Sequence, residues 1–140
     1  MVLEGGMANF KIMVVEDEGV IALGLQMKLE SWGYTVDPVV SSGEMAVCES
    51  FRIKPDLIIM DIGVKGKFNG IEAARRIRDL KIPVIYVTGR DDEVLIREAL
   101  ETVPYALLKK PVDHEVLKQK IRSALPKNKL RKKKRDKLGV

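Results

Sequence analysis

The sequence of 140 residues predicts an α/β fold in which a parallel sheet is covered by helices on both faces. Three observations support this class. Short apolar runs rich in β-branched residues alternate with segments of helical period along most of the chain. A polar residue follows directly on four of these runs. The composition, 46% hydrophobic and 32% charged, excludes a chain that is disordered throughout.

Five apolar segments are expected to form strands, and five segments between and after them to form helices. Residues 56–60 are almost continuously apolar, as in a strand covered on both faces. Pro38 favours an edge position for the second strand, since proline cannot donate to the ladder. Pro126 is expected to end the last helix. The expected strands are 10–15, 34–40, 56–60, 83–87 and 105–108, and the helices that follow them end near residues 32, 54, 80, 101 and 125.

Five such strand–helix units leave few arrangements, because crossover connections between parallel strands are right-handed. The commonest is the flavodoxin-like, doubly wound five-stranded sheet with strand order 2-1-3-4-5. We therefore expect one folded domain over residues 9–125, after an N-terminal extension of residues 1–8. Residues 126–140 are expected to form a basic, disordered tail.

The net charge of +5 comes from that tail. Residues 127–137 hold eight Lys or Arg and one Asp, which leaves 17 basic and 19 acidic residues elsewhere. The folded part is therefore slightly acidic. Binding of 127–137 to nucleic acid would be nonspecific and salt-sensitive, since the segment has no stacking or base-reading residues. A solvated extension without a partner is the alternative.

The chain has a single cysteine, Cys48, which excludes an internal disulfide and a multi-cysteine zinc site. We expect this side chain to be buried or half-buried on the second helix, and Met27 to lie in the core. No apolar run approaches the roughly 20 residues of a membrane helix. The N-terminus lacks the pattern of a signal peptide. A cytoplasmic protein without membrane insertion is expected.

Polar residues at the strand ends are predicted to surround one depression. In an open parallel sheet, ligands bind beyond the carboxyl ends of the strands, where the strand order reverses. The strand ends carry Glu16 and Asp17, Asp61, Thr88, and Lys109 and Lys110. Any one of the acids, taken alone, can equally be a residue of a helix N-terminus.

Three carboxylates cannot stay together uncompensated, since two unit charges 4 Å apart repel by about 4 kcal/mol at an effective dielectric constant near 20. A divalent cation and one lysine would cancel the charge. Oxygen ligands suit Mg²⁺, which also accepts phosphate oxygens. A carboxylate beside Mg²⁺ that faces an ammonium and a hydroxyl can attack phosphorus and form an acyl phosphate.

Five segments together resemble the receiver domain of two-component response regulators. They occur in the family's order and spacing, and the resemblance covers about residues 9–125. The segments are 12–18, 56–62, 69–74, 83–89 and 108–111.

The resemblance implies that Asp61 accepts a phosphoryl group from the phosphohistidine of a histidine kinase or phosphotransfer protein. It implies that Asp17, Asp61 and the backbone carbonyl of Gly63 bind Mg²⁺ directly, and that Glu16 binds it through water.

The resemblance further implies that Thr88 is the switch hydroxyl. Lys110, which immediately precedes Pro111, matches the lysine of the family motif, and Lys109 does not. Phosphorylation would shift the equilibrium between conformations of the surface over residues 91–125, and this surface would bind a downstream partner. The domain would be a signalling module rather than an enzyme. The only reactions it would catalyse are its own phosphorylation and autodephosphorylation. Only 15 residues follow residue 125, too few for a DNA-binding helix-turn-helix unit, so a stand-alone receiver or a truncated chain is expected. Whether the chain forms a homodimer is left open by the sequence.

Several positions depart from the family pattern. Glu16 stands where aspartate is commoner, and Gly63 has no side chain to position a water. Leu107 stands where an aromatic switch residue is frequent, and whether Tyr105, two residues earlier, replaces it stays open. The loop 64–69 is longer than the common version.

Three other functions were weighed against these residues. A Mg²⁺-dependent phosphatase or phosphotransferase for small molecules of the haloacid-dehalogenase type would need an Asp-x-Asp motif after the first strand, where the chain has Glu16, Asp17 and Glu18. A flavin site would need a phosphate loop there, and three acids would repel the phosphate. A scaffold or nucleic-acid binder that works through 127–137 would have no need of the acids, Thr88 and Lys110. The single histidine, His114, is expected on the surface.

Overall fold

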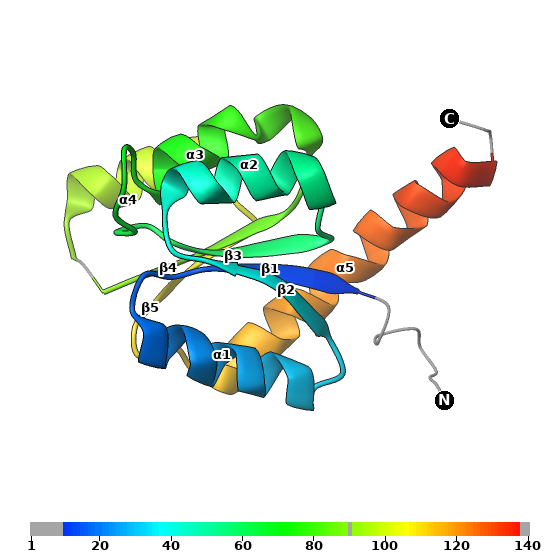
Figure 1. Ribbon diagram of the computed structural model, residues 1–140, viewed down its shortest axis with the longest axis horizontal. Helices are drawn as coiled ribbons and strands as arrows, with labels where there is room; N and C mark the ends of the chain where they lie inside the picture. Colours follow the sequence, from blue (N-terminus) through cyan, green and yellow to red (C-terminus); the bar gives the residue numbers. More distant parts are fainter. Residues whose placement is uncertain (1–9, 90, 138–140) are drawn as a thin grey trace.

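A computed structural model of the chain describes residues 10–89 and 91–137, with the side chains of 126–137 left out. Its five strands form one parallel sheet in the order β2-β1-β3-β4-β5, which confirms the predicted flavodoxin-like topology (Figure 1). Each strand agrees with its expected segment to within two residues. The strands are β1 (Lys11–Val15), β2 (Thr35–Val40), β3 (Leu57–Asp61), β4 (Val84–Thr88) and β5 (Ala106–Lys109).

Helices cover both faces of the sheet, as Figure 1 shows. One face is covered by α1 (Gly19–Ser31) and α5 (His114–Lys137), and the other by α2 (Gly43–Ile53), α3 (Gly70–Arg76) and α4 (Glu93–Glu101). The predicted helix over 70–80 is divided, because a 3₁₀ turn, η2 (Arg78–Leu80), follows α3. None of the helices among the described residues combines the length and the apolar character that a membrane span requires.

The core consists of two apolar layers, one on each face of the sheet. Successive side chains of a strand point to opposite faces, so Ile58 and Met60 of β3 join the layer under α2, α3 and α4, while Leu57 and Ile59 join the layer under α1 and α5. All five residues of β3 are buried. Full burial of one such side chain contributes about 1.5–3 kcal/mol to the stability of the fold. Because β3 is buried along its whole length, its carboxyl end is held firmly in place.

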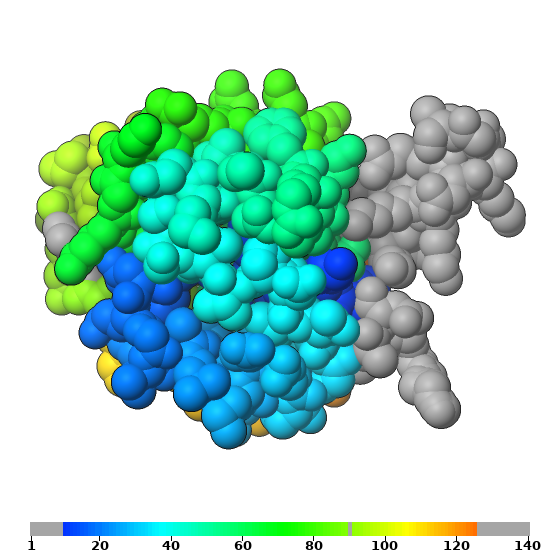
Figure 2. Space-filling view, in the orientation of Figure 1, coloured from blue at the N-terminus to red at the C-terminus, as the bar shows by residue number. Residues whose placement is uncertain are grey.

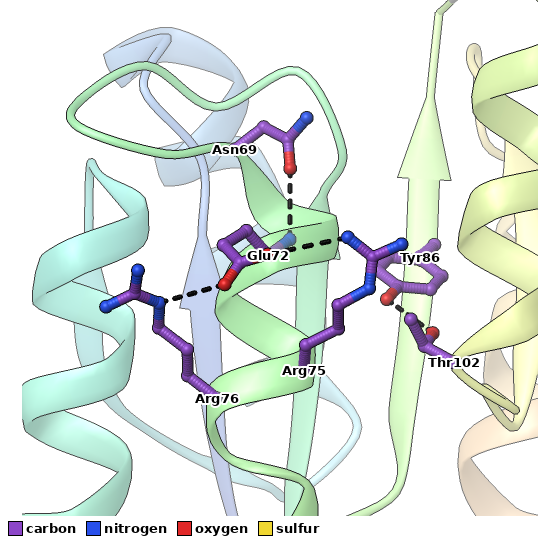
Figure 3. A network of polar contacts seen from close by, with 6 residues as sticks. All are labelled: Asn69, Glu72, Arg75, Arg76, Tyr86 and Thr102. Atoms are coloured by element: carbon purple, nitrogen blue, oxygen red, sulfur yellow. Dashed lines mark hydrogen bonds and ion pairs between the residues drawn. The ribbon is translucent and has the colours of Figure 1, made fainter.

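Side-chain caps begin the helices that lie over the α2–α4 layer. The hydroxyl of Ser42 accepts the N–H of Met45, and the amide oxygen of Asn69 accepts the N–H of Glu72. The carboxylate of Glu72 then pairs with Arg76 and Arg75 along α3, as Figure 3 shows. These ion pairs lie on the surface, where such pairs contribute little, so the cap is the stronger determinant of where α3 begins.

Three predictions, one about a helix end and two about burial, are wrong. α5 does not end at Pro126, because its helical backbone runs on to Lys137. A proline removes one N–H donor and disfavours a helix without forbidding it, and the lysines and arginines that follow are good helix formers. The disorder expected for the basic tail stays a prediction, and residues 138–140 and 1–9 lie outside the described residues. Cys48 is exposed, and Met27 is 62% exposed, because each lies on the side of its helix that faces away from the sheet.

Candidate functional site

Two neighbouring strands in the middle of the sheet bring the predicted acids to one edge. β1 and β3 pair in parallel, with Val15 beside Met60, so the residues that follow and end these strands lie together. Glu16 is 4% exposed and Asp61 is 7% exposed. The backbone N–H of Glu16 donates to the carbonyl of Val40 on β2, which fixes the start of the loop that carries Asp17.

The three predicted carboxylates meet. Glu16, Asp17 and Asp61 each offer one oxygen, and these oxygens all lie within 4.8 Å of one another. Three carboxylates form a hard, anionic donor set of the kind that binds Mg²⁺ together with water and phosphate oxygens. The residues therefore fit the metal that the family implies.

Lys110 is the cation of this cluster. Its Nζ lies 3.0 Å from Oε1 of Glu16 and 3.5 Å from Oδ2 of Asp61. Lys109 lies on the outside instead, where it pairs with the exposed carboxylate of Asp91. The distinction between the two lysines follows from the strand pleat, which turns consecutive side chains to opposite sides.

The backbone around Lys110 and Asp61 holds both side chains in place. The N–H of Lys110 donates to the carbonyl of Thr88 on β4 at 2.8 Å. The N–H of Gly63 donates to Oδ1 of Asp61 at 3.1 Å. A side chain at Gly70 would lie 2.5 Å from the carbonyl oxygen of Asp61, so the chain can pass this close to the acid only with glycine there.

An open cleft lies at the carboxyl edge of the sheet, where the polar residues at the strand ends led us to expect one. Asp17, Asp61, Gly63, Thr88 and Lys110 are among its lining residues. Thr88 is 1% exposed and ends β4 beside the acids. A phosphoryl group that enters the cleft would therefore meet carboxylates, an ammonium and a hydroxyl together.

The ionisation of Glu16 and Lys110 reflects this crowding. Burial raises the pKa of Glu16, and the charge of Asp61 adds to the rise, while the hydrogen bond from Lys110 opposes it; the pKa stays above its usual 4.5. Burial lowers the pKa of Lys110, but the hydrogen bond to Glu16 and the charge of Asp61 outweigh it, so the pKa lies above 10.5. With three acids and one ammonium, the ionised cluster carries a net charge of −2, which a divalent cation would cancel.

The strand that ends in Thr88 carries a buried aromatic residue that the sequence analysis missed. Tyr86 lies on β4 and shares a face with Thr88, two residues further on. Its side chain is fully buried, and its hydroxyl is 2.7 Å from Oγ1 of Thr102, which follows α4 (Figure 3). Across the sheet it lies beside Leu107, the position where the family often has its aromatic switch residue. The period-2 pattern of 84, 86 and 88 was the signal that could have identified it.

Tyr105 does not lie near Thr88. It precedes β5, and its N–H donates to the carbonyl of Val84 at the opposite end of β4. Its side chain is 43% exposed. In the described structure, the aromatic ring that lies between the sheet and α4 thus comes from Tyr86.

Comparisons with known proteins agree with this geometry. The family model of the response regulator receiver domain matches residues 12–122. The sensory transduction protein BceR of Halalkalibacterium halodurans is 32% identical over 117 residues, which are 83% of this chain and 50% of that protein. The alkaline phosphatase synthesis transcriptional regulatory protein PhoP of Bacillus subtilis is 40% identical over 87 residues, 61% of this chain and 35% of that protein. The chain thus spans about half the length, or less, of these curated relatives.

Solved structures show the same likeness in three dimensions. The signal receiver domain of a modulated diguanylate cyclase from Desulfovibrio desulfuricans G20 has a TM-score of 0.80 and 34% sequence identity, and the match covers 86% of this chain and 97% of that one. A response regulator from Clostridium difficile has a TM-score of 0.76 and 26% identity, with 84% and 96% covered. On the matched residues, the sheet order and the acidic edge of the sheet, the chain belongs to the response regulator receiver domain family.

Proposed function

We propose that this receiver domain accepts a phosphoryl group on Asp61 from the phosphohistidine of a histidine kinase or phosphotransfer protein, in a Mg²⁺-dependent reaction. The observation that carries the proposal is the position of Lys110, whose Nζ is 3.5 Å from Oδ2 of Asp61 and 3.0 Å from Oε1 of Glu16, beside the carboxylate of Asp17. An ammonium, a nucleophilic carboxylate and a metal-binding acid pair are together what phosphoryl transfer to a carboxylate requires.

In the proposed reaction, a carboxylate oxygen of Asp61 attacks phosphorus. The new P–O bond forms while the P–N bond to the donor imidazole breaks, and the electron pair of that bond returns to the imidazole nitrogen. Asp17, Asp61 and the carbonyl of Gly63 would hold Mg²⁺, with Glu16 bound through water, and the metal supplies positive charge to the phosphoryl oxygens. The N–H of Gly63 keeps the Asp61 carboxylate oriented before the attack.

Two further groups would bind the phosphoryl group. The ammonium of Lys110 can move from the carboxylates to a phosphoryl oxygen, since it already lies between Glu16 and Asp61. The hydroxyl of Thr88 would donate to another oxygen. Because Thr88 ends β4, its inward movement would be transmitted to α4, which follows that strand.

The output surface is proposed to lie over residues 91–125. This part of the chain exposes several large apolar side chains, as a surface that binds a protein partner commonly does. The exposed apolar residues are Val94, Leu100, Val103, Tyr105 and Val116. Phosphorylation would change the affinity of this surface for a downstream protein or for a second copy of the chain.

Intact-mass measurement tests the proposal. The protein is incubated with a small acyl phosphate donor, with Mg²⁺ or with a chelator, as wild type and as Asp61→Asn. We expect one phosphoryl adduct in the wild type with Mg²⁺ only, and none in the variant. Asp56→Asn, at the other end of β3, is the matched control and should be modified like the wild type. Turnover of a small phosphate ester without any adduct would instead favour an enzyme of the phosphatase class.

A further inference from the structure

The long loop between β3 and α3, residues 63–69, joins an acid of the proposed metal site to the start of α2. The backbone N–H of Lys65 donates to Oδ2 of Asp17 at 3.1 Å. The carbonyl of the same residue accepts the N–H of Gly43 at 3.3 Å. One peptide segment thus bridges the metal-site carboxylate and the first residue of α2.

Glu44, in the first turn of α2, holds the middle of this loop. Its Oε1 accepts the N–H of Lys67 at 2.9 Å. The backbone N–H groups of Glu44 itself and of Lys67 lower the pKa of this carboxyl, so it is ionised at neutral pH. The carboxylate therefore binds the loop through a charge-assisted hydrogen bond, although it lies outside the acidic cluster.

Glycines allow the loop to lie this close to α2. Gly66 has a φ of +115°, and a side chain there would overlap Oε1 of Glu44. A side chain at Gly43 would overlap the carbonyl oxygen of Phe68. Val64, at the start of the loop, is 3% exposed and packs into the core. In Figure 2 the green atoms of the loop lie against the cyan atoms of α2, in agreement with these contacts.

We propose that Glu44 is a positioning residue for Mg²⁺ binding and acts through this loop. With the loop held against α2, the Lys65 N–H fixes the carboxylate of Asp17, which shares the proposed site with Glu16 and Asp61. The same anchoring fixes the backbone at Gly63, whose carbonyl is a proposed ligand. The inference rests on the proposed function, because it concerns the same metal site.

Mg²⁺ affinity, measured by titration calorimetry on the full chain, tests the proposal. Glu44→Ala removes the acceptor for the loop, and we expect the Mg²⁺ dissociation constant to rise about fivefold, the worth of one hydrogen bond. Glu44→Gln keeps an acceptor oxygen and loses only the charge, so its loss of Mg²⁺ affinity should be smaller than that of Glu44→Ala. Glu49→Ala is the matched control, since Glu49 lies on the same helix but pairs with Arg52, and its affinity should be unchanged.

A thermal melt without Mg²⁺ and a second variant separate positioning from a general effect on stability. Gly66→Ala forces the loop away from Glu44 and should weaken Mg²⁺ binding like Glu44→Ala. If Glu44→Ala melts lower but binds Mg²⁺ like the wild type, the role is structural and the inference is overturned. Equal losses in Glu44→Ala and Glu44→Gln would also overturn it, because the acceptor would not matter. If the wild type itself does not bind Mg²⁺, the proposed function fails first.

Discussion

Replacement of Asp61 by asparagine is predicted to stabilise the metal-free protein. The substitution removes one negative charge from the cluster but keeps the side chain's shape and an acceptor oxygen for the N–H of Gly63. Two unit negative charges 4.8 Å apart, the upper limit of the spacing between the oxygens of the cluster, repel by about 3.5 kcal/mol at an effective dielectric constant near 20. Asp61 faces two such charges, on Glu16 and Asp17, so it meets about 7 kcal/mol of repulsion.

Attraction to Lys110 offsets part of this repulsion. At 3.5 Å the same dielectric constant gives about 5 kcal/mol of attraction, which leaves a net cost of about 2 kcal/mol for the Asp61 charge. Because water in the open cleft screens all of these charges, we expect a gain of about 1–2 kcal/mol in the free energy of unfolding. For a domain of this size the melting temperature should rise by about 3–6 °C.

The assay is thermal and urea unfolding in chelator-treated buffer and again with Mg²⁺. Mg²⁺ should stabilise the wild type more than the variant, since the metal binds the wild-type cluster more tightly. Asp56→Asn is the control for the substitution itself. Asp56 is buried and accepts the N–H of Lys11 at 2.7 Å, so loss of its charge should destabilise the protein. An Asp61→Asn protein that melts at or below the wild type without Mg²⁺ would refute the electrostatic reasoning.

Three further predictions concern single side chains. Tyr86→Phe loses the hydrogen bond to Thr102 and should cost about 1–2 kcal/mol in urea unfolding at neutral pH. Burial raises the pKa of Tyr86 above 10.0, so the stability that its protonated hydroxyl contributes is complete below pH 10 and is lost as the pH rises through the folded-state pKa. Over that alkaline range Tyr86→Phe should lose less stability than the wild type. An equal loss in both proteins would contradict this. Because the pKa of Glu16 is raised in the folded protein, the stability that its protonated carboxyl contributes is complete below pH 4.5 and is lost as the pH rises through the folded-state pKa. The metal-free wild type should therefore gain stability on acidification through this range, relative to Glu16→Gln, and parallel pH curves would count against the burial argument. Ser42→Ala removes the cap of α2 and should cost about 1 kcal/mol in urea unfolding, whereas Ser41→Ala should cost little.

The strand order and the meeting of the acids could be predicted because both depend on the chain's period and on topology. A short apolar run such as 56–60 is typical of a buried strand, and right-handed crossovers then place its end beside that of the first strand. The position of Asp61 next to Glu16 follows from this without any knowledge of side-chain contacts. The choice of Lys110 over Lys109 depended on the family motif, and the structure places these two lysines accordingly.

Other features could not be predicted, because they depend on contacts between residues far apart in the sequence. Nothing in the segment around Met27 tells which apolar side of α1 faces the sheet, since that helix has apolar residues on several sides. The end of α5 depends on a balance between one proline and the helix propensity of the residues after it. The contact of Lys65 with Asp17 uses a backbone N–H, which every residue except proline carries, so the side-chain pattern gives no signal for it.

The central claim is that the cleft makes the carboxylate of Asp61 the nucleophile for phosphorus. Borohydride reduction of the phosphorylated protein, followed by peptide mass mapping, tests this most directly, because the reagent reduces an aspartyl phosphate to homoserine and leaves free carboxylates unchanged. The account predicts homoserine at position 61 alone, and only in samples treated with both Mg²⁺ and the acyl phosphate donor. Modification at another residue, or a phosphoryl adduct that resists reduction, would contradict it.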